Sequence, residues 1–525
     1  MSVAIIACRA QIGLEAPSVC VEVSLGSGLP TFTIVGLPAT VVKESKDRVR
    51  AALINSNFEF PAGRITVNLS PADIPKRGGR FDLPIALGIL LASGQIKTHL
   101  PQAARTTSCE FYGELGLSGE LKPVGGLLLA AAHAARDGNE MLIPRGSADE
   151  VRVLLRAAAS PPVREDTPQT GVLVVRAAEH LLDVCNHVSG TEVLPPLAPS
   201  SASLIAHGDG ALDLRDVRGQ VQAKRALTIA AAGGHSLLML GPPGIGKSML
   251  AMRLPTLLPP MTDAEALEVA AIASASAAGF NAESFGRRPV RTPHHTASAV
   301  SLIGGGTRAR PGEVSLAHHG VLFLDELLEY DRRALEALRE PMESGVVCVS
   351  RAAMQARYPA EFLLVAAMNP CPCGRYGDNT GNCRCTPAQV AQYRGRISAP
   401  LLDRFDIHLE LPRVDLSDFD DSALLGESST TVAARVARAR EIQIARQGKC
   451  NARLTDAQIG RFCTADKEGR AILDRAMKML GFSARARQRI VKLARTIADL
   501  QCAEVVGVSH VSEAVMYRTL DRPPQ

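Results

Sequence analysis

The chain has 525 residues, enough for about two to four domains that each bury an apolar core. Its composition, 46% hydrophobic and 21% charged, is that of a globular protein, and a net charge of only +5 excludes a nucleic-acid binder that works through a global basic field. The amino terminus lacks a secretory pattern and the apolar runs are too short to span a bilayer. We therefore expect a cytoplasmic protein without membrane association, whose twelve cysteines are reduced.

The first region, residues 1–188, is predicted to be an α+β domain, because β-type and helical segments are mixed along it. Strands are predicted at 19–24, 31–35, 65–69, 111–115 and 140–143, and helices at 42–55, 81–91 and from 124–126 to 135.

Two segments of this region, 73–79 and 113–126, resemble the proteolytic domain of Lon protease, which has a ribosomal S5 domain 2-like fold. That family uses a Ser–Lys dyad, but residues 79–82 contain no serine and residues 127–129 no lysine. An activated nucleophile needs its base, so we expect a Lon-like domain without peptidase activity. Two basic residues are interpreted as solvated loop charges, with contact to a partner or nucleic acid as the alternative: Lys76 and Arg80.

Residues 189–210 are rich in Pro, Ser, Ala and Gly and are interpreted as a linker. An ATPase core is predicted for residues 211–413, and a mostly helical domain for residues 414–525. The whole is an α/β arrangement with a helical lid, preceded by the α+β domain.

The core contains the pattern G-x-x-x-x-G-K-[ST] between an apolar strand at 236–240 and a predicted helix at 249–254. Its members are Gly241, Pro242, Pro243, Gly244, Ile245, Gly246, Lys247 and Ser248. Glycines let the backbone N–H groups approach phosphate oxygens, Lys247 is expected to contact the β- and γ-phosphates of ATP, and Ser248 to hold Mg²⁺. The alternative is a glycine-rich turn that matches by chance.

Two further apolar strands end in polar side chains. Asp325 and Glu326 follow the run 321–324, and they are expected to hold Mg²⁺ and to activate the attacking water, respectively. The alternative makes Asp325 a helix N-cap. Asn369 follows the run 362–368 and is expected to sense the γ-phosphate, with a simple Asn-Pro turn as the alternative.

Two arginines are candidates for transition-state stabilisation. Arg404 is interpreted as an arginine finger that reaches a neighbouring subunit, the alternative being a local ion pair with Asp403 or Asp406. Arg485, at the start of a predicted helix over 484–500, is interpreted as a second γ-phosphate sensor or as a solvated arginine, with neither favoured.

Taken together, these pieces resemble the magnesium-chelatase-related AAA+ ATPases. The resemblance rests on segments 241–248, 291–298, 311–319, 324–326 and 369–374 and extends over nearly the whole chain. Within the AAA+ superfamily the group is similar to the replicative MCM helicases. The resemblance implies a homo-hexameric ring, and a helicase that drives branch migration of single-stranded or branched DNA during natural transformation.

Two segments are candidates for DNA contact. Residues 346–358 alternate in polarity around a short turn and predict a hairpin. In MCM-like helicases a hairpin here carries a basic residue into the ring's pore, and Arg351 matches that place. The insertion 287–310 is the second segment, and its candidate residues are His294, His295, Arg308 and Arg310. Basic loops of this kind track a phosphate backbone; the alternative is two solvated loops.

A loop rich in Gly and Asn contains Cys371, Cys373, Cys383 and Cys385. Four thiolates from one short loop suit a tetrahedral structural Zn²⁺, although the one-residue spacing within each pair is uncommon. The alternative is four reduced thiols.

The sequence therefore predicts an ATP-dependent DNA motor. The main alternative is a chelatase-like motor that remodels proteins or inserts metal and does not act on DNA. An ATP-dependent peptidase is disfavoured because the dyad is missing.

Overall fold

The computed structural model describes residues 2–99, 108–159, 173–199, 212–306, 309–351, 354–376, 383–412 and 426–521. The chain divides into two compact units. The first contains Met1–Leu204 together with Thr262–Gly286 and Ser350–Arg357, and the second contains the remainder. In the part of the chain described, no helix combines the length and apolarity needed to cross a bilayer.

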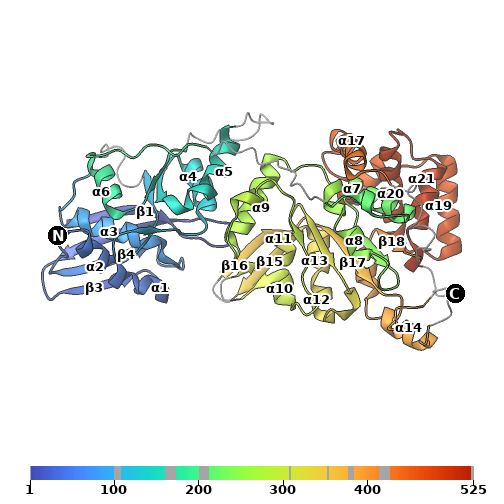
Figure 1. Ribbon diagram of the computed structural model, residues 1–525, viewed down its shortest axis with the longest axis horizontal. Coiled ribbons are helices and arrows are strands. Elements are labelled where there is room, and N and C mark those ends of the chain that lie inside the picture. The colour runs from blue at the N-terminus through green and yellow to red at the C-terminus, as the bar shows by residue number, and fades with distance from the viewer. Residues whose placement is uncertain are drawn as a thin grey trace. The chain divides into compact units, whose positions relative to one another are not determined.

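The first unit is built on a mixed seven-stranded sheet in the order β3-β4-β2-β1-β5-β8-β9 (Figure 1). The strands are β1 (Ser2–Arg9), β2 (Ser18–Gly26), β3 (Thr31–Val35), β4 (Arg64–Ser70), β5 (Cys109–Phe111), β8 (Glu140–Pro144) and β9 (Val175–Ala178). β2 pairs antiparallel with β1 and β4, whereas β5, β8 and β9 run parallel to β1. The α+β character predicted for this region is therefore present.

Helices pack on this sheet through apolar side chains. The main ones are α2 (Ser45–Asn55), α3 (Asp82–Ala92), α4 (Leu127–Asp137), α5 (Ala148–Ala159) and α6 (Leu181–Ser189). α3 is apolar on all sides, so ten of its eleven residues are buried. Helix α9 (Asp263–Ala275), which comes much later in the chain, also belongs to this unit, and its Ser274 hydroxyl donates to Glu150 of α5.

Both interpretations of Lys76 and Arg80 are wrong, because neither side chain is a solvated charge or an exposed contact. Lys76 is fully buried and its ammonium donates to the carbonyl of Pro71. Arg80 is 6% exposed and donates to the carbonyl of Gly125 over 2.6 Å. Buried carbonyls need donors, and these two cations supply them. Arg80, which directly follows the first segment that resembles Lon protease, therefore joins it to the second segment, which contains Gly125.

The second unit contains a five-stranded sheet in the order β11-β14-β17-β10-β18, with every pair parallel. Its strands are β10 (Leu237–Leu240), β11 (Val290–Arg291), β14 (Val321–Leu324), β17 (Leu363–Met368) and β18 (Ile407–Glu410). The residues of β10, β14 and β17 are all buried, as expected for a parallel sheet covered on both faces. The expected α/β core is confirmed.

Helices surround this sheet (Figure 1). Those of the core are α7 (Val221–Gly233), α8 (Lys247–Ala251), α10 (Ala299–Ile303), α11 (Glu313–Leu316), α12 (Arg332–Ala337), α13 (Arg339–Ser344), α14 (Pro387–Arg394) and α15 (Ala399–Leu402). The carboxyl-terminal region is helical, as predicted, with α17 (Ser429–Gln447), α18 (Asp456–Phe462), α19 (Lys467–Leu480), α20 (Ala484–Leu500) and α21 (Val508–Met516). Leu227 of α7, Val436 of α17 and Leu493 of α20 lie in one apolar cluster with the sheet. Whether these helices act as a lid stays a prediction.

Two short ribbons complete the second half of the chain. The predicted hairpin is present as β15 (Val346–Arg351) and β16 (Met354–Pro359). The other ribbon pairs β12 (Gly304–Gly305) with β13 (Arg310–Pro311). The Tyr358 hydroxyl donates to the carbonyl of Ala309 over 2.8 Å, so the base of the hairpin is joined to the second ribbon.

Candidate functional site

The candidate nucleotide residues meet at one edge of the parallel sheet. Because β10, β14 and β17 run in the same direction, their carboxyl ends lie along the same edge. Lys247 follows β10 through the phosphate-loop motif, Asp325 follows β14 directly, and Asn369 follows β17 directly. Ligands of open α/β sheets bind at this edge.

Lys247 lies at the centre of the group. Its Nζ donates to the carbonyl oxygens of Gly241 over 2.6 Å and Pro242 over 3.0 Å, and to Oδ1 of Asn369 over 3.0 Å. Burial lowers the pKa of Lys247, whereas the negative charges of Asp325 and Glu326 act to raise it. The structure thus joins the lysine predicted to contact phosphate with the amide predicted to sense it.

Ser248 and Asp325 form the second half of the group. The Ser248 hydroxyl donates to Oδ2 of Asp325 over 2.6 Å, and the other carboxylate oxygen accepts the backbone N–H of Glu326 over 2.9 Å. Asp325 is not the helix N-cap of the alternative, because the short helix that follows, Leu327–Glu329, has Glu326 at its N-cap. A hydroxyl and a carboxylate oxygen at this separation are the donors that Mg²⁺ takes in nucleotide sites.

Glu326 adopts the left-handed conformation, with φ of +49°, which is uncommon for a residue with a side chain. Its Oε2 lies 3.3 Å from Nδ1 of His295. The loop that carries His295 is also fastened to this segment, because the Tyr330 hydroxyl donates to the carbonyl of Pro293 over 2.5 Å. His295, predicted only as a DNA contact, therefore lies against the expected water-activating carboxylate.

The phosphate loop has the backbone that its glycines predict. Gly244 and Gly246 have φ of +81° and +91°, conformations that side chains disfavour. A Cβ on Gly244 would meet nothing within 4 Å, so the loop is open on that side. Alternating backbone conformations of this kind present successive N–H groups to an anion.

Sequence reasoning missed Gln220, which precedes α7 in the left-handed conformation with φ of +47°. Its Nε2 donates to the carbonyl of Ile245 in the phosphate loop over 2.7 Å. Its Oε1 is buried and has no hydrogen-bond partner among the described residues. Only a turn before a helix marked this position in the sequence.

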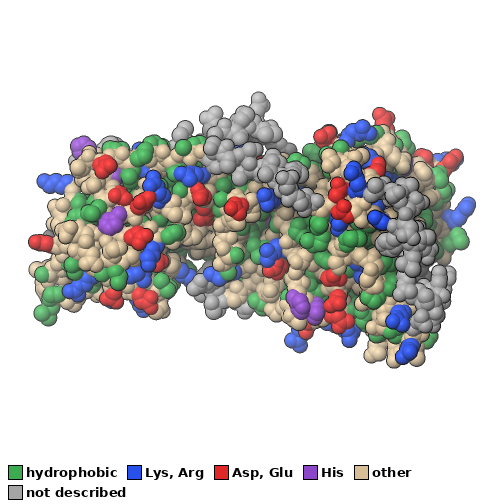
Figure 2. Space-filling view, in the orientation of Figure 1, with side chains coloured by type: hydrophobic (Ala, Val, Ile, Leu, Met, Phe, Trp, Pro, Cys, Tyr) green, Lys and Arg blue, Asp and Glu red, His purple; other side chains and the backbone are tan. Residues whose placement is uncertain are grey.

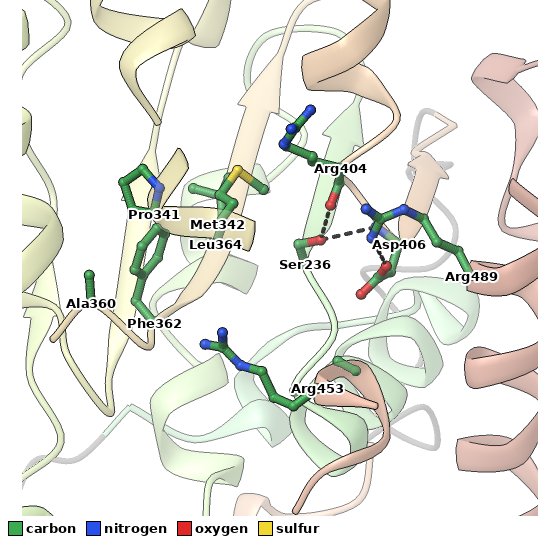
Figure 3. Close-up of a pocket in the computed structure, with 12 residues that line it drawn as sticks. Ser236, Pro341, Met342, Ala360, Phe362, Leu364, Arg404, Asp406, Arg453 and Arg489 are labelled. Atoms are coloured by element: carbon green, nitrogen blue, oxygen red, sulfur yellow. Dashed lines mark hydrogen bonds and ion pairs between the residues drawn. The ribbon is translucent and has the colours of Figure 1, made fainter. Parts of the chain in front are cut away.

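Arg404 lies at the opposite edge of the same sheet, in a pocket of about 70 Å³ that other residues of this unit line (Figure 3). Its carbonyl accepts the hydroxyl of Ser236, which precedes β10, over 2.8 Å. Its guanidinium donates to the carbonyls of Pro400 over 2.6 Å and Arg339 over 3.2 Å, and it is ion-paired with Glu343. The local partner is therefore Glu343, not Asp403 or Asp406.

The pocket is rich in positive charge. Figure 3 shows Arg489 reaching from α20 to Asp406, and Arg453 extending into the pocket from another side. Burial lowers the pKa of Arg404; Glu343 opposes this, and the charges of Arg339, Arg485 and Arg489 lower the pKa further. Arg485 is exposed in the first turn of α20, and its charge lies close to Arg404. The structure thus groups Arg485 with Arg404.

Asp406 anchors this edge. Its Oδ2 lies 3.0 Å from Nδ1 of the buried His235, whose Nε2 lies 2.7 Å from the Thr496 hydroxyl of α20. Burial acts to raise the pKa of Asp406, but the charge of Arg489 and the hydrogen bond of His235 hold this pKa well below its usual value. The strand edge and α20 are therefore joined by a buried polar network.

The candidate DNA residues are only partly within the described chain. Arg310 is half-buried in β13, and Arg351 is the last residue of β15, with its side chain outside the described part. Arg308 lies outside the described residues. His294 is exposed and its ring packs 4.1 Å from that of His295. On the face in Figure 2, basic and acidic side chains are interspersed, in keeping with the small net charge.

The four cysteines of the metal prediction come together. The Sγ atoms of Cys371, Cys373, Cys383 and Cys385 all lie within 4.8 Å of one another. Cys371 is 3.3 Å from Cys373 and 3.8 Å from Cys383. Backbone N–H groups of Arg384 and Arg375 donate to the Cys373 sulfur and lower its pKa to about 6. Zn–S bonds of about 2.3 Å require sulfur separations of about 3.8 Å in a tetrahedron, so the thiols fit this metal.

Comparison with known proteins places the chain in a family. The model of "Magnesium chelatase, subunit ChlI" matches residues 213–419, that of "Subunit ChlI of Mg-chelatase" matches residues 21–147, and that of "Magnesium chelatase, subunit ChlI C-terminal" matches residues 426–518. The chain is 47% identical to the uncharacterized protein YifB of Salmonella typhimurium and 46% identical to YifB of Escherichia coli. It is also 46% identical to the competence protein ComM of Haemophilus influenzae. Each alignment covers 99% of this chain and 98% of the relative. The chain belongs to the ComM/YifB family of magnesium-chelatase-related AAA+ proteins.

Proposed function

We propose that this protein hydrolyses ATP and uses the energy to move on DNA as a ring of identical subunits. The observation that carries the ATPase is the pair of contacts at the carboxyl edge, Lys247 with Asn369 and Ser248 with Asp325. These four side chains come from the segments that follow three separate strands, and they converge at the phosphate loop. Beside that loop, the buried Oε1 of Gln220 has no hydrogen-bond partner among the described residues. It is suited to accept a hydrogen bond from the amino group of adenine.

In this function Lys247 binds the β- and γ-phosphates, and Ser248 and Asp325 hold Mg²⁺. When bound, the metal neutralises charge on the phosphate oxygens. Glu326 accepts the proton of the water that attacks the γ-phosphorus, and Asn369 orients the γ-phosphate. The products are ADP and phosphate.

The ring is needed because Arg404 is not at this edge. Ser236 precedes strand β10 (Leu237–Leu240) and Gly241 of the phosphate loop follows it, so five steps of about 3.3 Å separate them by about 16.5 Å. Arg404 and Arg485 therefore serve the nucleotide of a neighbouring copy, where they stabilise charge on the transferred phosphoryl group. A cyclic homo-hexamer, as the sequence resemblance implies, supplies such a neighbour for every site.

Mixing two inactive variants tests this arrangement. Lys247→Ala and Arg404→Ala should each hydrolyse ATP very slowly, because each removes half of every site. Co-expressed in equal amounts, they should recover activity, since about one interface in four then joins an intact Lys247 to an intact Arg404. A mixture no more active than its components would show that Arg404 acts within its own subunit or not at all.

Two observations support the proposal that the motor moves on DNA. One relative is named as a competence protein, and the ribbon β12–β13 is joined to the hairpin β15–β16. Arg310 and Arg351 lie on these ribbons and His294 and His295 on the loop before them, whereas Arg308 is a candidate from the sequence alone. Charge on such ribbons suits contact with a phosphate backbone rather than with bases. We propose branch migration during integration of transforming DNA as the activity.

The DNA proposal has a direct test. The protein should exchange strands of a branched DNA substrate only with ATP, and DNA should stimulate hydrolysis in a salt-dependent manner. Arg351→Ala should lose the stimulation and keep basal hydrolysis. Arg152→Ala, which removes an exposed arginine of α5 that is paired with Asp149, is the control. Stimulation that survives Arg351→Ala would remove this residue from the DNA contact.

The matching chelatase models favour one alternative, a motor that remodels a protein or inserts a metal. Hydrolysis that responds to no DNA of any structure, while the mixing test succeeds, would support it. We also propose that Cys371, Cys373, Cys383 and Cys385 hold a structural Zn²⁺, that the amino-terminal unit is a Lon-like domain without peptidase activity, and that the protein works in the cytoplasm.

A further inference from the structure

The cysteine cluster is attached directly to the proposed nucleotide site. Cys371 comes two residues after Asn369, whose amide accepts the Lys247 ammonium over 3.0 Å. From Cys371 the chain turns back, and the N–H of Gly374 donates to the Cys371 carbonyl over 2.9 Å. The cluster and the amide that contacts Lys247 therefore lie only a few residues apart in the chain.

The turn also touches the phosphate loop. Gly374 has φ of +74°, and a Cβ at this position would lie 2.6 Å from Cδ of Pro243, the third residue of the phosphate-loop motif. Real Cβ contacts are longer, so the close approach of the two backbones depends on a glycine. Displacement of the turn would remove the packing that supports the Pro243 ring.

A third segment is tied to the same cluster. Helix α14 begins just after Cys385, with Thr386 as its N-cap. Its Arg394 donates to the carbonyl of Pro370 over 3.1 Å, and the guanidinium lies 5.3 Å from the ring centroid of Tyr376. Cys371 is buried, whereas Cys373 and Tyr376 are exposed, so these two side chains add little burial to hold the described part of the loop in place.

We propose that a divalent zinc ion bound by the four cysteines holds the Cys371–Gly374 turn against Pro243, so that metal occupancy sets the affinity of the phosphate loop for nucleotide. This rests on the zinc and ATP sites proposed above. Four thiolate–metal bonds close the loop from Cys371 to Cys385 and remove the conformational freedom of the turn. Loss of the metal frees the turn, and Pro243 and Asn369 then lose their ordered positions.

The test measures metal content and nucleotide affinity separately, on the full chain. Wild-type protein should bind one zinc per chain, and removal of zinc with a chelator should weaken binding of a fluorescent ADP analogue by about tenfold. Added zinc chloride should restore the affinity. Cys383→Ser should bind less zinc and bind the analogue weakly, whereas Cys20→Ser, which changes a cysteine of β2 outside the cluster, should behave as wild type.

A pair of glycine variants isolates the contact itself. Gly374 and Gly448 have the same φ of +74°, but a Cβ on Gly448 would meet nothing within 4 Å. Gly374→Ala should keep its zinc and lose nucleotide affinity by about tenfold, and Gly448→Ala, which carries the same backbone strain, should keep both.

Three results would overturn the proposal: a wild-type chain that binds no zinc, zinc-free protein that binds the ADP analogue as tightly as loaded protein, or equal affinities of Gly374→Ala and Gly448→Ala. In each case ATP hydrolysis by wild-type protein would still support the proposed function. Absence of all nucleotide binding, with zinc present, would instead contradict the proposed function.

Discussion

The two edges of the five-stranded sheet hold their functional side chains in different ways. At the carboxyl edge these side chains bond to one another, Lys247 to Asn369 and Ser248 to Asp325. At the amino edge Arg404 is held by backbone carbonyls and by one exposed carboxylate, and other arginines surround it. The first edge has its charges nearly balanced, whereas the second carries an excess of positive charge. Under the proposed function, the difference means that one chain carries two halves of a hydrolysis site that it cannot join by itself.

The largest expected effect is at the amino edge. Arg404→Ala should lower kcat for ATP by about 10³-fold or more, as for other arginine fingers, and leave ATP affinity nearly unchanged. Steady-state hydrolysis and a separate nucleotide titration measure the two quantities. Glu343→Gln is the matched control, because it removes the ion pair and keeps the guanidinium. Equal losses in both variants would mean that Arg404 is only a structural ion-pair partner.

The carboxyl edge should respond almost as strongly. Glu326→Gln should lower kcat by about 10²- to 10⁴-fold and retain ATP binding, because the amide cannot accept the proton of water. Lys247→Ala should weaken nucleotide binding itself. Single-turnover hydrolysis with radiolabelled ATP separates the two. Normal turnover by Glu326→Gln would remove its assigned role.

The buried network that anchors the amino edge predicts an effect on stability. Asp406→Asn should cost about 3 to 5 kcal/mol at pH 7, because it leaves Arg489 and His235 without a carboxylate. Since the folded pKa of Asp406 is depressed, its contribution is present above the unfolded pKa of about 4 and is lost as the pH falls through the lower folded value. The gap between wild type and variant should therefore close only below about pH 4.

Urea unfolding at several pH values measures this gap. Asp474→Asn, an exposed carboxylate on α19, is the control and should change stability by less than about 0.5 kcal/mol. An Asp406→Asn variant as stable as wild type at pH 7 would show that the network does not hold this edge.

The smallest effect concerns the residue that sequence reasoning missed. Gln220→Ala should weaken ATP binding by about fivefold, the loss of about one hydrogen bond next to the phosphate loop. Calorimetric titration measures it, with Val221→Ala, an exposed neighbour, as the control. Unchanged affinity would mean that the free acceptor of Gln220 does not face the nucleotide.

Much of the second unit was predictable because its signals are local. The strands β10, β14 and β17 are short apolar runs that are followed by polar residues, and the carboxyl-terminal helices are long and periodic. The hairpin β15–β16 and the helices α17 and α20 were also found. The first unit was less predictable: β1, α5, β9 and α6 were missed, and a single strand predicted at 111–115 is two, β5 and β6 (Glu114–Leu115).

Other features depended on contacts between residues far apart in the chain. Arg80 has the pattern of an exposed loop charge, yet it is buried, and the carbonyl of Gly125, 45 residues away, accepts its hydrogen bond. The contact of His295 with Glu326 and that of Gly374 with Pro243 join loops that no spacing rule connects. Helix α9 likewise belongs to the first unit through contacts with residues far from it in the chain.

The sequence by itself determined the phosphate loop, the carboxylates and the amide that follow the apolar strands, and the four cysteines of one loop. These signals are local, because glycine spacing, apolar runs and ligand chemistry are properties of neighbouring residues. The tertiary structure alone decided which of these lie at which edge of the sheet. Parallel strand order brings Lys247, Asp325 and Asn369 to one edge and leaves Arg404 at the other, where the charge of Arg485 from helix α20 acts on it. The physical reason is that strand direction, which separates the two edges, is set by pairing between segments more than a hundred residues apart.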